Sequence, residues 1–116
     1  MKQKLKKMIL KLSISYRQVA VFSSSLNNSF NEWTDEHFEQ GFSFRPGAVS
    51  FDTLEDGEFE IKIIQKKQFR TKNSNEIIRI IRVPFNVNGT IEVGSINQTK
   101  AINLEKGDYT IYYCLF

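Results

Sequence analysis

The chain has 116 residues, of which 41% are hydrophobic and 25% are charged; this length and balance predict a single globular domain and exclude an intrinsically disordered chain. The formal net charge is +3, and the single cysteine excludes an internal disulfide. No stretch approaches the roughly 18 apolar residues of a membrane-spanning helix, and the apolar run after the first lysines is too short for a signal peptide. We therefore expect a cytoplasmic protein.

The first predicted strand follows a basic segment. Residues 1–11 hold five lysines and no acid, which predicts a flexible segment ahead of a domain at residues 12–116. Residues 11–22 alternate between apolar and polar side chains, but the apolar face changes parity between Tyr16 and Val19. That change predicts one strand that carries a bulge or is buried on both faces.

One short helix is predicted at about residues 34–40. Thr34 can cap its N-terminus, two carboxylates follow at the positive end of the helix dipole, and Gly41 can end it. Trp33 and Phe38 stand at the spacing of a hydrophobic staple. Together these signals define both ends of the helix.

The rest of the chain alternates between apolar and polar residues in short runs separated by turn formers, so about seven strands are expected. Asp56-Gly57 and Asn88-Gly89 each predict a β-hairpin, and Pro84 predicts an edge strand or a bulge because proline cannot donate to a ladder. The pattern predicts a mainly β fold, an antiparallel β-sandwich with one short helix, and leaves a partly open barrel as the alternative. The predicted strands are residues 11–22, 48–54, 58–64, 77–87, 91–96, 100–104 and 109–115.

Residues that could carry chemistry are few. One histidine, His37, and one cysteine, Cys114, lie far apart in the sequence, so a catalytic dyad is not expected. Cys114 sits in an apolar run, where burial disfavours the thiolate and favours a packed side chain. The carboxylates around His37 provide too few ligands for zinc and lack the loop pattern of a calcium site. The sequence therefore predicts a protein that is not an enzyme and that binds no cofactor and no metal.

Charge is segregated along the chain. Residues 32–60 hold nine acids and one base, a formal charge of −8, whereas residues 61–82 hold seven bases and one acid, a formal charge of +6. Aromatic side chains alternate with carboxylates in the acidic segment, as they do in protein interfaces. Helix capping and solvated strand faces explain the same acids equally well. The candidate partner-binding residues are Glu32, Trp33, Asp35, Glu36, Glu39, Phe42 and Asp52.

The basic segment offers an alternative function. Its cationic side chains surround one aromatic residue, a combination that can contact a nucleic-acid backbone. No recognised nucleic-acid-binding motif accompanies it, so a solvated loop and strand face is the favoured interpretation. The candidate nucleic-acid-binding residues are Lys62, Lys66, Lys67, Phe69, Arg70 and Lys72.

Five stretches of the sequence, in their order and spacing, resemble one known family. They are LSISYRQ at 12–18, EWTDEHFEQGF at 32–42, GAVSF at 47–51, VPFNV at 83–87 and KGDY at 106–109. Together they resemble the ComJ (Nin) family of competence proteins, whose members inhibit the DNA-entry nuclease. The resemblance implies a bacterial protein that binds such a nuclease stoichiometrically and has no direct contact with nucleic acid. It also implies a role in DNA uptake, or an immunity-like protection of the cell from its own nuclease.

The resemblance supplies a target for the acidic segment. A nuclease must present a cationic groove to DNA, and clustered carboxylates with aromatic anchors would occupy that groove. Contact with the inner face of the cell membrane through the nuclease is left open. A homodimer is also left open, because relatives are expected to continue for another strand after YYCLF and a missing strand would expose a sheet edge. The alternatives are an interaction module with a partner other than a nuclease, and the nucleic-acid binder.

Overall fold

The computed structural model describes residues 7–26, 31–65, 79–96 and 98–115. These residues form nine β-strands and one α-helix, α1 (Asp35–Gln40). All strand pairs among them are antiparallel. The prediction of a mainly β, antiparallel fold with one short helix near residues 34–40 is confirmed.

One layer of the fold is a five-stranded sheet with the strand order β3-β4-β2-β7-β8. Its central strands are buried along almost their whole length, whereas the edge strand β8 is mostly exposed. Its strands are β2 (Gln18–Ser23), β3 (Phe42–Arg45), β4 (Ala48–Asp52), β7 (Thr90–Ser95) and β8 (Gln98–Asn103).

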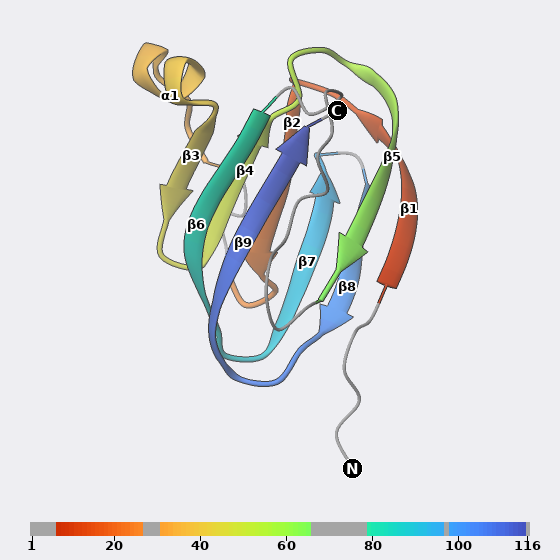
Figure 1. Cartoon of the computed structure of the whole chain (residues 1–116), viewed down its shortest axis with the longest axis vertical. Helices are drawn as coiled ribbons and strands as arrows, with labels where there is room; N and C mark the ends of the chain where they lie inside the picture. The colour runs from red at the N-terminus through yellow and green to blue at the C-terminus, as the bar shows by residue number, and fades with distance from the viewer. Residues whose placement is uncertain (1–6, 27–30, 66–78, 97, 116) are drawn as a thin grey trace.

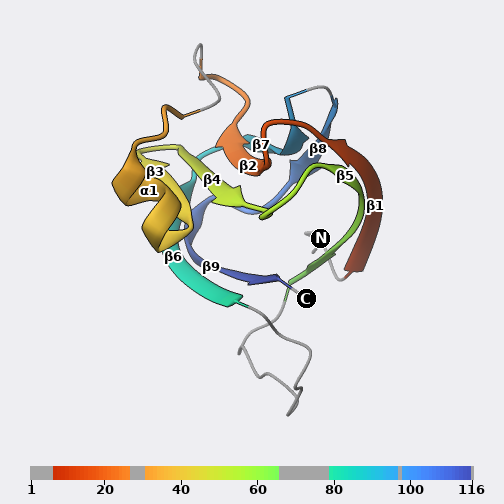
Figure 2. The same cartoon turned by 90° about the horizontal axis from the view of Figure 1, so that it is seen from above.

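Two strand pairs complete the sandwich. One pair is β1 (Lys7–Ile14) with β5 (Gly57–Ile64), and the other is β6 (Arg79–Val87) with β9 (Gly107–Leu115). Seen end-on in Figure 2, the β6–β9 pair faces the five-stranded sheet across the interior, and the β1–β5 pair curves around one side. The described strands form three separate sheets and no closed barrel.

The core lies between these layers and follows the alternation of the strands. In β6 every second residue is buried, from Ile81 to Val87, and the intervening residues are exposed. β2 and β4 contribute inward residues to the same core, while their opposite faces form a smaller cluster that Leu26 covers. The middle of the five-stranded sheet is therefore buried on both faces.

Residues 11–22 belong to two strands rather than to one. β1 ends at Ile14 and β2 begins at Gln18, with Tyr16 and Arg17 in the turn between them. The parity of the apolar face changes because the chain crosses from the β1–β5 pair to the five-stranded sheet, and not because a strand bulges. The prediction of one bulged strand was wrong.

Three other local predictions differ from the structure. Residues 7–11 were assigned to a flexible segment but belong to β1 and pair with β5. Neither predicted hairpin forms, because β4 and β5 lie in different sheets, as do β6 and β7. The residues after α1 add the short strand β3, so the described chain has more strands than expected. Pro84 lies in an edge strand, as predicted, because among the described strands β6 pairs only with β9.

Candidate functional site

Helix α1 begins and ends where its capping residues predict. The Thr34 hydroxyl accepts from the His37 backbone N–H at 3.4 Å, and the His37 Nδ1 accepts from the Thr34 backbone N–H at 3.0 Å. Gly41 ends the helix with φ +89° and donates its N–H to the His37 carbonyl at 2.8 Å. A Cβ at Gly41 would meet the guanidinium end of the flexible Arg79 side chain, which can move aside, so the positive φ is the main reason for glycine at this position.

Trp33 attaches the helix to the sandwich. Its ring centroid lies 5.0 Å from that of Phe38, which confirms the predicted staple contact. The indole Nε1 donates to the Gln18 side chain of β2 at 3.1 Å. Trp33 is half-buried and lies outside the core clusters, so its position suits an interface as well as packing.

Four of the predicted partner-binding carboxylates are exposed. Glu32 precedes the helix, and Asp35, Glu36 and Glu39 lie on it. Helix α1 buries none of its residues, so its acids face solvent rather than the sandwich. Phe42, which was predicted to be an interface anchor, is half-buried and packs against the main core.

Asp52 does not belong to this exposed surface. Its side chain is almost fully buried, with 1% of the residue exposed. Strand alternation assigns Asp52 and Ser50 to a solvent face, but β4 is an interior strand and both residues are buried. The expectation that Asp52 contacts a partner directly is therefore not supported by its position.

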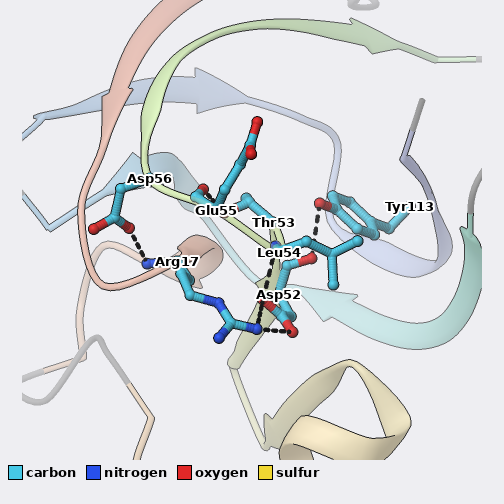
Figure 3. Close-up of polar contacts among 7 residues, drawn as sticks. All are labelled: Arg17, Asp52, Thr53, Leu54, Glu55, Asp56 and Tyr113. Atoms are coloured by element: carbon cyan, nitrogen blue, oxygen red, sulfur yellow. Dashed lines mark hydrogen bonds and ion pairs between the residues drawn. The ribbon is translucent and has the colours of Figure 1, made fainter.

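The buried Asp52 carboxylate holds the turn between β1 and β2. Its Oδ2 lies 3.1 Å from Arg17 Nη2, and its Oδ1 accepts from the Leu54 backbone N–H at 2.8 Å (Figure 3). The Arg17 backbone N–H donates to the Asp56 carboxylate at 2.6 Å, and the Arg17 carbonyl accepts from the Thr53 N–H at 2.9 Å. The turn is thus bound to the β4–β5 loop through both backbone and side chain.

Arg17 also reaches the helix. Its guanidinium carbon lies 5.6 Å from the centroid of the Phe38 ring, a cation–π contact. One side chain therefore connects the strand turn, the buried carboxylate of β4 and α1. Sequence reasoning did not identify Arg17, and the parity change next to it was the only signal of its turn.

These groups line an open cleft of about 350 Å³ formed by Tyr16, Arg17, Gln18, Trp33, Phe38 and Asp56. Tyr16 is 73% exposed and Phe38 is 44% exposed at its rim. In Figure 1, α1, the β1–β2 turn and the β4–β5 loop lie at the same end of the sandwich. Aromatic rings and exposed carboxylates thus share one end of the molecule.

The described residues hold no group of three or more histidines, cysteines, aspartates or glutamates that could bind a metal ion. The described part of the chain also contains no helix long and apolar enough to cross a membrane. Lys62 is exposed on β5, 4.0 Å from the Glu60 carboxylate. The other candidate nucleic-acid-binding residues, Lys66, Lys67, Phe69, Arg70 and Lys72, lie outside the described residues.

Cys114 is half-buried in β9, which is less burial than the sequence predicted. Burial raises the pKa of its thiol, so the thiolate is disfavoured at neutral pH. This agrees with the interpretation of Cys114 as a packing residue rather than a nucleophile.

The protein should lose stability at alkaline pH because the hydroxyl of Tyr113 is partly buried in the folded state. Burial, together with the negative charge of Asp52, raises the pKa of its hydroxyl well above the usual 10.0, and Arg79 opposes this in part. The folded protein keeps the proton that the unfolded chain releases. The stabilisation from the raised Tyr113 pKa should therefore be complete below about pH 10. Above that pH the free energy of unfolding should fall, by at most about 1.4 kcal/mol per pH unit.

Urea unfolding between neutral and alkaline pH measures this loss. Tyr113→Phe should show a flatter decline above the tyrosine pKa, because it removes the group that binds the proton in the folded state. Tyr112→Phe, on the exposed face of the same strand, is the matched control and should decline like the wild type. Equal slopes for the wild type and Tyr113→Phe would contradict the prediction.

Comparison with known proteins places these features in a family. Residues 11–116 match the model of the family described as Competence protein J (ComJ). The chain belongs to the ComJ family. A ComJ relative from Bacillus subtilis (strain 168), the DNA-entry nuclease inhibitor, is 33% identical over 102 residues, which cover 86% of this chain and 75% of the relative.

A solved ComJ structure has the same fold. It is the crystal structure of ComJ, inhibitor of the DNA degrading activity of NucA, from Bacillus subtilis. The TM-score is 0.80 at 32% sequence identity, and the match covers 95% of this chain and 83% of the other. Both relatives are named as inhibitors, in agreement with the prediction that this ComJ family member is not an enzyme.

Proposed function

We propose that this chain inhibits a DNA-degrading nuclease of the DNA-entry type by binding the enzyme stoichiometrically over its cationic DNA-binding groove. A Bacillus subtilis relative is named DNA-entry nuclease inhibitor, and the similar solved structure, also from Bacillus subtilis, is named an inhibitor of the DNA degrading activity of NucA. The observation that carries the proposed binding mode is the placement of exposed carboxylates on α1 beside the aromatic-lined cleft. No covalent chemistry is needed, because occupying the groove is enough to exclude DNA.

Charge and shape have separate roles in this proposal. Asp35, Glu36 and Glu39 project from a helix that buries none of its residues, so their charges are available to a partner. Such charges accelerate encounter with a cationic surface, to rate constants of about 10⁸–10⁹ M⁻¹s⁻¹ at low salt. Trp33 and Phe38 provide the apolar area that holds the complex once it has formed.

The test is a titration of DNA cleavage by a DNA-entry-type nuclease from the same genome. We expect complete inhibition by the wild-type chain near an equimolar ratio. Combined replacement of Asp35→Asn, Glu36→Gln and Glu39→Gln should raise the inhibition constant about tenfold or more, chiefly through slower association that depends less on salt.

A matched control changes the same amount of charge elsewhere. The control combines Glu60→Gln, Glu92→Gln and Asp108→Asn, which lie on β5, β7 and β9 and not on α1. This variant should inhibit within about threefold of the wild type, because it leaves the charges on α1 in place. Equal weakening by both triple variants would show that net charge, and not α1, governs binding.

Three further expectations from the sequence stay predictions. They are a cytoplasmic location, contact with the membrane through the nuclease, and a homodimer. Cell fractionation with and without the nuclease tests the first two, and sedimentation of the purified chain tests the third.

A further inference from the structure

The turn between β1 and β2 has an unfavourable backbone conformation. Tyr16 and Arg17 have φ angles of +60° and +55°, in the left-handed region that side chains other than glycine and asparagine rarely adopt. Two such residues in succession cost free energy, and glycine or asparagine at the first position would reduce that cost. The chain instead places a large aromatic ring there.

That ring does little for the fold. Tyr16 is 73% exposed, the largest exposure among the large hydrophobic residues that the structure describes. It lies outside both core clusters. A bulky side chain that strains the backbone and faces solvent is explained if its role is to contact another molecule.

The neighbouring contacts hold the turn in place. Arg17 is fixed by its ion pair with Asp52, by the two backbone hydrogen bonds to the β4–β5 loop and by its contact with Phe38. These contacts keep the turn rigid before any partner binds. A rigid anchor loses less conformational entropy on binding than a mobile one.

Charge indicates what the ring would meet. The Arg17 guanidinium is paired with the Asp52 carboxylate, while Glu55, Asp56 and Glu58 are exposed beside the turn. An aromatic face with a carboxylate rim favours a cationic side chain, which packs on the ring and pairs with the acids.

We infer that Tyr16 is a further aromatic anchor of the inhibitory interface, in addition to Trp33 and Phe38, and packs against an arginine or lysine in the cationic groove of the nuclease. Asp52 is then a positioning residue, which acts through Arg17 and does not touch the partner. This inference rests on the proposed function and adds to it a second contact region beside α1, on a different part of the chain.

Tyr16→Gly tests the inference because inhibition should weaken while the stability of the fold is kept or increased. Glycine adopts the positive φ without strain, so the melting temperature should stay the same or rise. The inhibition constant for the nuclease should rise about tenfold or more, the size expected for loss of an interface hot spot. Tyr16→Asn, which also tolerates this backbone, should behave in the same way.

Two further variants separate contact from structure. Tyr16→Phe keeps the aromatic face and should inhibit within about threefold of the wild type. Tyr112→Ala removes an exposed tyrosine from the outer face of β9 and should leave inhibition unchanged. Full inhibition by Tyr16→Gly, or an equal loss in Tyr112→Ala, would overturn the inference.

The same experiment keeps the two proposals apart. If the α1 triple variant inhibits more weakly than the wild type but Tyr16→Gly inhibits fully, only the role of Tyr16 is overturned. The proposed function then stands. Failure of the wild type to inhibit the nuclease overturns the proposed function and the inference with it.

Discussion

Phe51→Ala is expected to lower the free energy of unfolding by about 3–5 kcal/mol, the range for removing a fully buried phenylalanine side chain. Phe51 lies in the interior strand β4 and is 1% exposed. Its ring stacks on Tyr113 of the opposite layer, with centroids 4.4 Å apart and an interplanar angle of 7°. Alanine would leave a cavity between the two layers of the sandwich, and urea unfolding measures the loss.

Phe44→Ala is the matched control for this prediction. Phe44 belongs to β3, which pairs with β4 in the same sheet, but it is 42% exposed. Its replacement should cost less than about 1 kcal/mol, because little apolar surface returns to water. Similar losses in the two variants would mean that the core is not centred on Phe51.

Asp52→Ala is expected to lower the free energy of unfolding by about 2–4 kcal/mol. The change removes the ion pair with Arg17 and leaves the Leu54 backbone N–H without its acceptor. Leu54 itself has a positive φ of 69°, so the β4–β5 loop would lose the contact that holds a strained residue. Because Arg17 is half-exposed, water compensates part of the lost ion pair. The expected loss in the free energy of unfolding is therefore smaller than for a fully buried pair.

Asp52→Asn separates the shape of this side chain from its charge. The amide oxygen can still accept from Leu54, so about half of the stability loss should be recovered. The ion pair is absent in both variants, so both should weaken inhibition if Arg17 positions Tyr16. Measuring unfolding and nuclease inhibition on the same preparations checks both results, and intact inhibition by both folded variants would exclude the positioning role.

The helix and its surroundings show what could be predicted from local sequence. Thr34 and Gly41 define the ends of α1 through contacts within one turn of chain, and the staple between Trp33 and Phe38 spans only a few residues. Such signals do not depend on the rest of the fold. The mainly β class was predictable for the same reason, since alternation is a property of each strand.

Strand pairing was not predictable in this way. Asp56-Gly57 is a good hairpin turn, yet the strands on its two sides pair with β2 and β1 rather than with each other. A turn signal states only that the chain reverses. The choice of partner depends on burying both faces of β4, which involves residues distant in the sequence.

The acidic segment, residues 32–60, has some features that the sequence predicts and others that depend on the packing of the strands. Its composition and its resemblance to the ComJ family predicted an inhibitor with an acidic region, and of these the family is confirmed. The sequence could not distinguish the carboxylates of α1, which face solvent, from Asp52, which is buried and holds Arg17. That distinction depends on what covers each face of a sheet, and only the tertiary structure determines it.

For this protein, the sequence by itself determined the class of fold, the helix ends and the family. Only the tertiary structure brought Tyr16, Trp33 and Phe38 around one cleft. The physical reason is the separation along the chain of the residues that interact. Capping and alternation act between neighbours in the chain, whereas the cleft depends on which strands pack together and on one arginine that connects three separate elements.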